Sequence, residues 1–276
     1  MIVTKSKVPS IPIPELRGSI KHITYPAFAE LKLDGEFNFL VYTPKLCFLI
    51  NKYGTVRKNF PALNDIEKIL KNNVGTDVGH DKGSCMLVCE VYWDKGKLHD
   101  IYKLNSHKKD DDTKIAVFDV VSWNGDLRRE VLVDRLEGLH ALGLSDYTPE
   151  SKVVLNEVEL EQFFEQMVKD GYEGIVAKPL DGIFPAGPCP WAKVKFKDQN
   201  DCAVTLVDTS KERIEIISVS VDPTSGKPRM IPVGVKAPNK YKKHIKVGEV
   251  VTIEHQGVLE SGSLRHPVLI PKGEWK

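Results

Sequence analysis

The sequence predicts a two-domain protein in which a mixed α+β domain precedes a small all-β domain. Up to about residue 197, segments that alternate apolar and polar residues like strands are interspersed with segments of helical spacing. From residue 198 onward the helical period nearly disappears, and short β segments lie between turns, a pattern typical of a small barrel. A length of 276 residues is enough for about two domains of ordinary size.

The composition indicates a globular protein with no strong overall charge. The chain is 41% hydrophobic and 28% charged, which allows a packed core and excludes a disordered chain. The formal net charge is +1, so a surface that binds nucleic acid must be local. No apolar run reaches the length of about 18 residues that a membrane helix needs, and residues 1–14 lack a signal-peptide core. We therefore expect the protein in the cytoplasm (nucleoid), or in the host-cell cytoplasm if it is viral. We also expect a monomer.

The cysteines predict a reducing compartment. There are five, an odd number, in a chain without a secretion signal, which favours free thiols. Cys85 and Cys89 lie in an apolar strand-like run, on the same face of it. No second Cys/His pair follows at the spacing of metal ligands, so we expect small buried hydrophobes and no zinc site.

Taken in order, the chain of the first domain begins with a basic, proline-punctuated segment, residues 1–25, which we expect to lie extended over the surface. Strand patterns cover residues 29–33, 37–42, 45–50, 84–93, 115–121, 174–178 and 192–196. The strand over 45–50 is expected to pair with 37–42. Helical spacing covers residues 61–70, 131–142 and 158–169; Pro61 suits the start of the first helix and Gly143 the left-handed residue closing the second. Loops are expected over residues 72–83, 94–112 and 181–190, and second-domain strands over 203–208, 213–221, 229–235 and 249–255.

The most informative stretch is Glu30-Leu31-Lys32-Leu33-Asp34-Gly35. Alternation predicts a half-buried strand that ends at an Asp-Gly turn, which would place Lys32 beside Glu30 in a cleft. A lysine amine is a nucleophile only when it is neutral, and a dry site or neighbouring cations favour that form. We therefore predict that Lys32 attacks a nucleotide phosphate and carries the nucleotide covalently. A lone Lys-x-Asp-Gly is more often a solvated turn, so the prediction depends on residues further along the chain.

Several of those residues carry suitable chemistry. Glu90 lies inside an apolar strand, where a buried carboxylate needs a cation, a metal or a ligand hydroxyl; the alternative is a strand residue that faces solvent. Phe118 could stack on a base or pack in the core. Glu173 could hold a divalent metal, and Lys178, at the other end of the same short apolar strand, a phosphate.

A pair of lysines follows on the next strand. Lys193 and Lys195 lie on one face of it, at a spacing suited to binding phosphate; the alternative is a solvated edge strand.

In this order the motifs resemble those of covalent nucleotidyltransferases, specifically minimal ATP-dependent DNA ligases. Residues 30–35 resemble the adenylation motif of that family, residues 51–54 its second motif, Glu90 the acid of the third, and Phe118-Asp119 the segment that stacks on adenine. Residues 173–178 and 191–195 resemble the fourth and fifth motifs, and the resemblance extends to about residue 267. It implies a nucleotidyltransferase (ATP-grasp-like) domain over residues 1–197 and an OB-fold domain over residues 198–276.

The resemblance also implies a reaction and its site. Lys32 would attack the α-phosphate of ATP, AMP would pass from lysine to the 5′-phosphate of a nick, and the 3′-hydroxyl would then displace AMP. It implies that the ATP or AMP is bound by Glu30, Leu31, Lys52, Glu90, Phe118, Lys178, Lys193 and Lys195. Glu173 and Asp34 would hold Mg²⁺ (or Mn²⁺). The partner would be nicked duplex DNA in replication, repair or recombination.

Two positions depart from the family pattern. Phe37 and Lys52 stand where the family usually has arginine, and lysine lacks the two-pronged hydrogen bonding of a guanidinium. Arg57 is a candidate to compensate and to contact DNA.

The second domain carries a basic segment without acids between residues 227 and 246, which could bind phosphates without reading sequence. Its basic residues are Lys227, Arg229, Lys236, Lys240, Lys242, Lys243 and Lys246, and Arg265 follows in Leu264-Arg265-His266-Pro267. The alternative for this segment is a solvated barrel loop.

Other functions stay open at this point. An RNA ligase or RNA-repair enzyme of the same superfamily would share most motifs, and an mRNA capping enzyme would prefer GTP. A nucleic-acid-binding module without catalytic activity is a third alternative.

Overall fold

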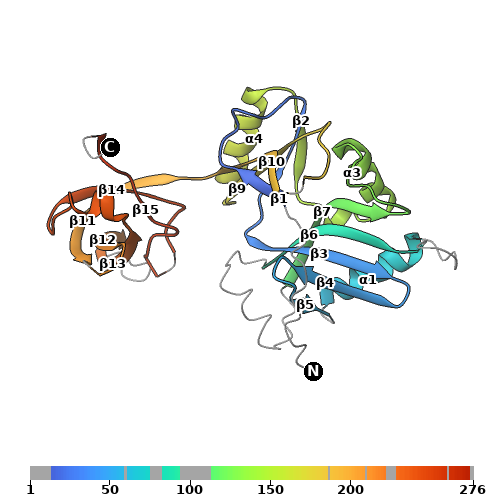
Figure 1. The fold of residues 1–276 in the computed structure, drawn as a ribbon, viewed down its shortest axis with the longest axis horizontal. Helices are drawn as coiled ribbons and strands as arrows, with labels where there is room; N and C mark the ends of the chain where they lie inside the picture. Colours follow the sequence, from blue (N-terminus) through green and yellow to red (C-terminus); the bar gives the residue numbers. More distant parts are fainter. Residues whose placement is uncertain are drawn as a thin grey trace. The chain divides into compact units, whose positions relative to one another are not determined.

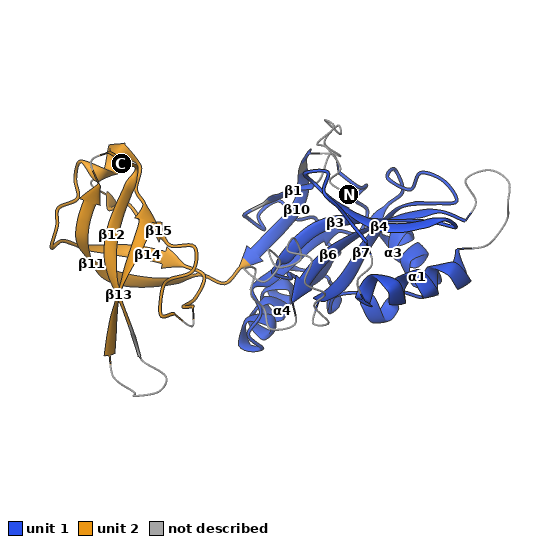
Figure 2. Ribbon diagram, turned by 90° about the horizontal axis from the view of Figure 1, so that it is seen from below, with its two compact units in different colours: residues 1–194 blue, residues 195–276 orange. Residues whose placement is uncertain are grey.

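A computed structural model describes residues 14–58, 61–74, 83–93, 113–185, 187–208, 210–221, 228–259 and 261–273. The chain divides into two compact units, residues 1–194 (unit 1) and residues 195–276 (unit 2), which Figure 2 shows in two colours. Among the described residues, no helix is both long and apolar enough to cross a membrane.

Unit 1 contains two five-stranded sheets, which Figure 1 shows with helices beside them. The first sheet has the order β1-β10-β9-β2-β8, with β1 (Pro14–Arg17), β10 (Gly187–Lys195), β9 (Gly174–Pro179), β2 (Ala27–Leu31) and β8 (Ser151–Val154). The second sheet has the order β5-β4-β3-β6-β7, with β5 (Val56–Arg57), β4 (Leu46–Asn51), β3 (Gly35–Thr43), β6 (Cys85–Trp93) and β7 (Thr113–Trp123). The chain crosses from the first sheet to the second between Leu31 and Gly35, so the Lys-x-Asp-Gly segment bridges them.

Each sheet has an apolar face covered by helices. Helices α1 (Pro61–Asn73) and α3 (Leu132–Ala141) pack on the second sheet, because Leu63, Ile66 and Leu139 share one core cluster with its strands. Helix α4 (Glu157–Lys169) packs on the first sheet through Leu160 and Met167. A short 3-10 helix, η1 (Ser145–Tyr147), lies between α3 and β8.

A separate apolar cluster joins the two sheets. It contains Phe39 and Val88 from the second sheet and Cys189 and Trp191 from the first, all buried. A cleft adjoins this cluster, since Trp191 belongs to the cluster and also lines the cleft.

Unit 2 is a closed barrel with the strand order β11-β12-β13-β15-β14. Its strands are β11 (Asp198–Asp208), β12 (Arg213–Val221), β13 (Pro228–Lys236), β14 (Val250–His255) and β15 (Val268–Leu269), and a short helix, α5 (Asn239–Lys242), follows β13. Alternate residues such as Ile214, Ile216, Val233 and Val235 fill the interior. The four strands predicted for this region are confirmed, with ends shifted by up to five residues.

Most of the predicted elements of unit 1 are confirmed, including the three helices and the pairing of β3 with β4. Gly143, at φ +74°, follows α3 as expected. The expected loop over 181–190 is wrong in part, because β10 begins at Gly187. The expected surface segment over 1–25 is also wrong in part, because Pro14–Arg17 pairs in parallel with β10; residues 1–13 and the expected loop over 94–112 lie outside the described residues.

All five cysteines are buried and none forms a disulfide, as expected of small apolar side chains. Burial raises the pKa of the Cys47 and Cys85 thiols to about 12, so both are protonated at neutral pH. Cys85 and Cys89 occupy the same core cluster, which confirms that they share a face of β6.

Candidate active site

A cleft between the two sheets of unit 1 brings together residues from seven strands and their ends. It is lined by Glu30, Leu31, Lys32 and Leu33 at the end of β2, by Phe37, Glu90 and Phe118 from the second sheet, and by Val176, Lys178 and Trp191 from β9 and β10; Pro14, Leu16 and Pro149 complete it. Five residues predicted to bind the nucleotide, together with Lys32, therefore meet in one place.

Lys32 is held at the end of β2 by contacts to the segment before β9. Its backbone amide donates to the Gly174 carbonyl (2.9 Å), and its Nζ donates to Glu173 Oε2 (2.8 Å) and to the Leu33 carbonyl (3.2 Å). The Lys32 side chain is 18% exposed and that of Glu173 4%. The amine is thus fixed in the cleft and only partly exposed, as predicted, and the alternative of a solvated turn is excluded.

Glu90 lies beside this amine on β6. Burial raises the pKa of its carboxyl to about 8; the Lys32 charge opposes the shift, and the carboxylates of Glu173, Asp34 and Glu36 add to it. Gly35 permits this arrangement, because a Cβ there would lie 2.4 Å from the Val91 carbonyl oxygen and 2.6 Å from Glu90 Cγ. A glycine after Asp34 is therefore a packing requirement for bringing β3 against Glu90.

Glu30 and Lys178 form a buried ion pair on neighbouring strands, with Lys178 Nζ 2.5 Å from Glu30 Oε1. The ammonium also lies 4.6 Å from the centre of the Phe118 ring and 4.7 Å from that of Trp191. Burial raises the pKa of Glu30, with Lys178 opposing the shift, and Glu30 Oε2 has no hydrogen-bond partner among the described residues.

This pair corrects one sequence-based expectation. The strand alternation predicted a half-buried β2, but Glu30 is 4% exposed because both faces of β2 are covered. Glu30 already balances the charge of the Lys178 ammonium. The predicted binding of a phosphate by Lys178 therefore stays a prediction.

The aromatic side of the cleft consists of Phe37 and Phe118, whose ring centres are 6.1 Å apart. Phe118 lines the cleft as predicted for a residue that stacks on a base. The neighbouring Asp119 points the other way and forms a fully buried, two-bonded pair with Arg135 of α3 (2.8 and 3.0 Å). Asp119 therefore attaches a helix to the sheet.

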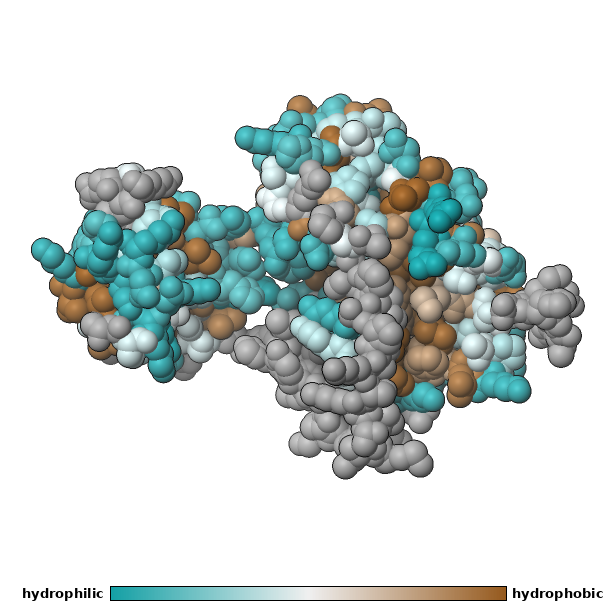
Figure 3. Space-filling view, viewed as in Figure 1, coloured by the Kyte–Doolittle hydropathy of each residue, from teal (hydrophilic) through white to brown (hydrophobic). Residues whose placement is uncertain are grey.

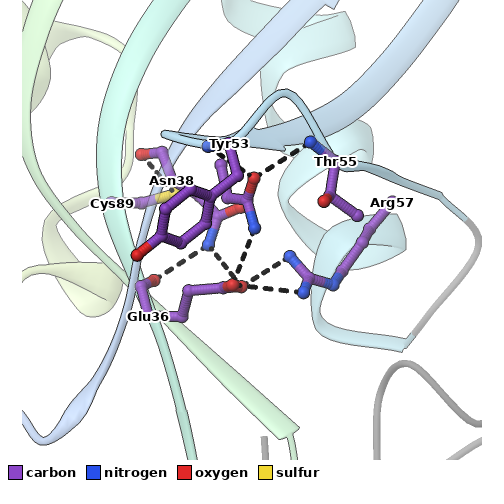
Figure 4. A network of polar contacts seen from close by, with 7 residues as sticks. Glu36, Asn38, Tyr53, Thr55, Arg57 and Cys89 are labelled. Carbon is purple, nitrogen blue, oxygen red and sulfur yellow. Dashed lines mark hydrogen bonds and ion pairs between the residues drawn. The ribbon is translucent and has the colours of Figure 1, made fainter. Parts of the chain in front are cut away.

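A second polar network, which Figure 4 shows, connects side chains of β3, β4 and β5. Glu36 accepts hydrogen bonds from Asn51 Nδ2 (2.8 Å) and Arg57 Nη2 (3.2 Å), and Arg57 Nη1 lies 2.5 Å from Glu36 Oε2. Asn51 Oδ1 accepts from the amides of Tyr53 and Thr55, which fixes the turn that follows β4.

This network corrects the prediction for Arg57. Its side chain is 9% exposed and engaged by Glu36, so it is a structural cation and not a surface contact for DNA. Lys52 is exposed, 5.0 Å from the centre of the Tyr53 ring, and does not line the cleft.

The candidate metal ligands lie close to Lys32 but do not form a cage. Within the described ranges, no group of three His, Cys, Asp or Glu side chains has the geometry to hold a metal ion. Mg²⁺ is usually held by one or two carboxylates together with substrate phosphates, so a cage is not required. Glu173 and Asp34 both act electrostatically on the Glu90 carboxyl, and carboxylates are the ligand type that Mg²⁺ prefers, so their role as metal ligands stays a prediction.

The lysines of β10 are half-buried, and neither Lys193 nor Lys195 is among the residues that line the cleft. Lys195 instead lines a separate depression of unit 2. Their binding of the nucleotide phosphates stays a prediction.

In unit 2, most of the predicted basic residues are exposed, and hydrophilic residues cover much of the face seen in Figure 3. The exposed ones are Arg229, Lys236, Lys240, Lys243 and Lys246; Arg265 is half-buried. Lys227 lies outside the described residues. The prediction for Lys242 is wrong, because this lysine is 9% exposed and its Nζ donates to the carbonyls of Asp208 and Lys211.

Sequence reasoning missed several residues of the cleft. Trp191 was noted only as part of a motif, yet its ring contacts the Lys178 ammonium. Phe37 was treated as a lost arginine, although an aromatic residue directly after the Asp-Gly-Glu segment is a signal for an apolar wall. Leu16 and Pro149 come from distant segments and carried no signal.

Comparison with known proteins agrees with the family resemblance found in the sequence. The family model of the ATP dependent DNA ligase domain matches residues 13–195. The chain therefore belongs to this family, and the resemblance stated above is confirmed.

Curated relatives match only in part. The chain is 27% identical over 202 residues to a DNA ligase of Sulfophobococcus zilligii, covering 66% of this chain and 32% of that protein. It is 36% identical over 103 residues to a probable DNA ligase of Persephonella marina, covering 34% of this chain and 17% of that protein. The chain thus spans about a third or less of the length of these two relatives.

Solved structures support the fold over nearly the whole chain. The chain superposes on the protein Pmar-Lig_PreS3 with a TM-score of 0.71 and 20% identity, covering 95% of this chain and 68% of the other. A Lig E DNA ligase gives a TM-score of 0.68 and 15% identity, covering 94% and 98% of the two chains. The mixed sheet-and-helix architecture expected of unit 1 is therefore confirmed.

Proposed function

We propose that this protein is an ATP-dependent DNA ligase that seals nicks between a 5′-phosphate and a 3′-hydroxyl in duplex DNA. The observation that carries the proposal is the Lys32 amine, fixed 2.8 Å from Glu173 in a cleft that also contains Glu90, Phe118 and the Glu30–Lys178 pair. The family membership and the names of the relatives support DNA as the substrate.

The first step forms a bond between Lys32 Nζ and the α-phosphorus of ATP. The bond from that phosphorus to the bridging oxygen breaks, pyrophosphate leaves, and the amine loses a proton. Because Glu173 pairs with the ammonium form of Lys32, the carboxylate must be drawn away or neutralised before the amine can attack. Glu173 and Asp34 are the residues that would hold Mg²⁺, which supplies charge neutralisation at the phosphates.

The rest of the cleft suits the nucleoside. Phe118 offers a face for stacking the base. Glu30 Oε2, which has no hydrogen-bond partner among the described residues, is an acceptor for an adenine amino group, and Glu90 lines the same cleft and could accept from a ribose hydroxyl. Leu31 adds apolar contact. In the later steps AMP would pass to the 5′-phosphate of the nick, and the 3′-hydroxyl would then displace it.

Unit 2 would hold the DNA. We propose that its closed five-stranded barrel is an OB-fold, that the domains are residues 1–197 and 198–276, and that the protein acts as a monomer. The exposed residues Arg229, Lys236, Lys240 and Lys243, with Arg265, would contact phosphates and make binding depend strongly on salt. Lys193 and Lys195 are proposed contacts to the nucleotide phosphates.

Incubation with α-labelled ATP and Mg²⁺ tests the proposal. We expect label on the wild-type chain that survives denaturation, no label on Lys32→Ala, and full label on Lys152→Ala, an exposed lysine of the neighbouring strand β8. Persistent labelling of Lys32→Ala would refute the assignment.

Sealing assays on nicked all-DNA and all-RNA duplexes then separate a DNA ligase from an RNA ligase, and labelling by GTP would indicate a capping enzyme. A chain that binds DNA but takes up no label would be a binding module.

A further inference from the structure

A second cavity of unit 1 adjoins the candidate active site. It has a volume of about 280 Å³ and is lined by residues of β2, β7, α3 and the segment from η1 to the start of β8. Three of its lining residues, Glu30, Phe118 and Pro149, also line the cleft that contains Lys32. These residues form the boundary between the two spaces, and the adenylation proposed at Lys32 uses only the cleft.

The cavity is apolar inside and polar at its rim. Phe28, Leu136 and Leu139 contribute apolar side chains that are buried or half-buried, as Phe118 does. The exposed lining residues are all polar: His140, Ser145, Thr148 and Ser151. An apolar cavity of roughly 150 Å³ is already large enough to bind benzene. The size and lining of this cavity therefore suit a group that contains an aromatic ring.

Glu30 and Phe118 relate this cavity to the nucleotide. Glu30 Oε1 is paired with Lys178, whereas Oε2 is buried and has no hydrogen-bond partner among the described residues. Under the proposed function Oε2 accepts from the amino group of adenine while Phe118 stacks on the ring, which places the amino group at the boundary with the cavity. That group has two N–H bonds, and Oε2 needs only one. A single substituent on the amino nitrogen would therefore leave the hydrogen bond to Glu30 intact.

Ser151 faces the cavity from the neighbouring strand. It lies opposite Glu30 in the antiparallel pairing of β2 and β8, so both side chains project from the same face of the sheet. Ser151 lines the cavity but not the cleft. The next residue, Lys152, is exposed and projects from the other face. A larger side chain at position 151 would fill the cavity without entering the cleft.

We propose that this cavity accepts a substituent on the base of the nucleotide, so that the protein uses ATP derivatives whose adenine amino group carries one apolar ring. The inference rests on the proposed function, because Glu30 and Phe118 must place the base, and it adds a substrate class to the same site. The substituent takes no part in the reaction: Lys32 Nζ still bonds to the α-phosphorus, and pyrophosphate still leaves.

The test compares three α-labelled nucleotides on the full chain. They are ATP, benzyl-ATP, with one benzyl group on the amino nitrogen of adenine, and dimethyl-ATP, in which two methyl groups replace both N–H bonds. We expect wild-type labelling by benzyl-ATP to be at least as efficient as labelling by ATP, because the ring is buried in the cavity. Labelling by dimethyl-ATP should be about tenfold less efficient, because its amino nitrogen cannot donate to Glu30.

Two matched variants test whether the cavity holds the ring. Ser151→Phe should keep the efficiency with ATP and lower that with benzyl-ATP at least tenfold, whereas Lys152→Phe, on the other face of β8, should behave as the wild type does with both. If Ser151→Phe loses both labels, Leu136→Phe fills the cavity from α3, and the same result is expected of it. The proposal is overturned if the wild type uses benzyl-ATP more than tenfold less efficiently than ATP or uses dimethyl-ATP equally well. It is also overturned if the filled variant accepts benzyl-ATP as the wild type does, since the substituent would then extend into solvent.

A binding measurement keeps this inference separate from the proposed function. Absence of label from ATP on the wild type would refute the proposed function alone. Calorimetry with adenosine and with the nucleoside of benzyl-ATP then tests the cavity without any reaction. We expect the benzylated nucleoside to bind at least as tightly as adenosine and about tenfold more weakly to Ser151→Phe. Weaker binding of the benzylated nucleoside to the wild type, or equal binding by the variant, would overturn the proposal.

Discussion

Replacing Glu90 with glutamine should make the stability of the protein less dependent on pH. The folded chain raises the pKa of this carboxyl from 4.5 to about 8. Between these values the folded state binds the proton more tightly than the unfolded state does, so wild-type stability falls as the pH rises through this interval. One unit of pKa shift corresponds to about 1.4 kcal/mol, so the full shift gives an upper limit of about 5 kcal/mol at pH 8 and above.

Thermal unfolding of the wild type and of Glu90→Gln between pH 5 and pH 9, without nucleotide or metal, measures this effect. We expect the melting temperature of the variant to gain on that of the wild type with each pH unit, by about 2–4 °C per kcal/mol for a unit of this size. Glu165→Gln, at an exposed position of α4, serves as the control. Parallel curves for wild type and Glu90→Gln would show that the cleft does not hold a protonated carboxyl and would refute this reasoning.

Further substitutions test the fold and the basic surface. Arg135→Ala should cost about 3–5 kcal/mol in chemical denaturation, because it leaves Asp119 buried without its partner; the double variant Asp119→Leu/Arg135→Met should recover most of this loss, and no recovery would mean that the cost is one of packing. Gly35→Ala should lower the melting temperature and abolish labelling by ATP, since the added Cβ meets backbone of the neighbouring strand; normal labelling would contradict the packing argument. Lys236→Ala should weaken DNA binding and reduce its salt slope by about one, whereas Lys242→Ala should leave the slope unchanged and lower stability. Equal salt slopes for these two variants would show that burial does not separate their roles.

The order of the motifs predicted several residues of unit 1 that meet, although Lys52, Lys193 and Lys195 from the same motifs do not line the cleft. Lys32, Glu90, Phe118 and Lys178 are far apart in sequence, yet all line one cleft. A strand pattern fixes the side on which each residue points, and the resemblance supplied the expectation that these distant residues share one site, which periodicity cannot provide.

The errors have a common cause, which is that burial depends on partners distant in sequence. Lys242 lies in a helix of four residues, too short for a periodic pattern, and the carbonyls it binds belong to the β11–β12 connection. Arg57 was predicted to be at the surface because nothing local indicated that Glu36 would bind it. Glu30 lies in β2, whose alternating residues predicted a half-buried strand, but the face of β2 that carries Glu30 is covered by the second sheet.

The position of β2 has a consequence for protein synthesis. The second sheet uses only residues between 35 and 123, so it can assemble while the ribosome is still adding later segments. In contrast, β2 pairs with β8 and β9, and the acid that orients the Lys32 amine lies 141 residues further on. The proposed nucleophile is therefore one of the last features of unit 1 to mature, so under the proposed function an unfinished polypeptide could not capture a nucleotide before the later strands of unit 1 have emerged.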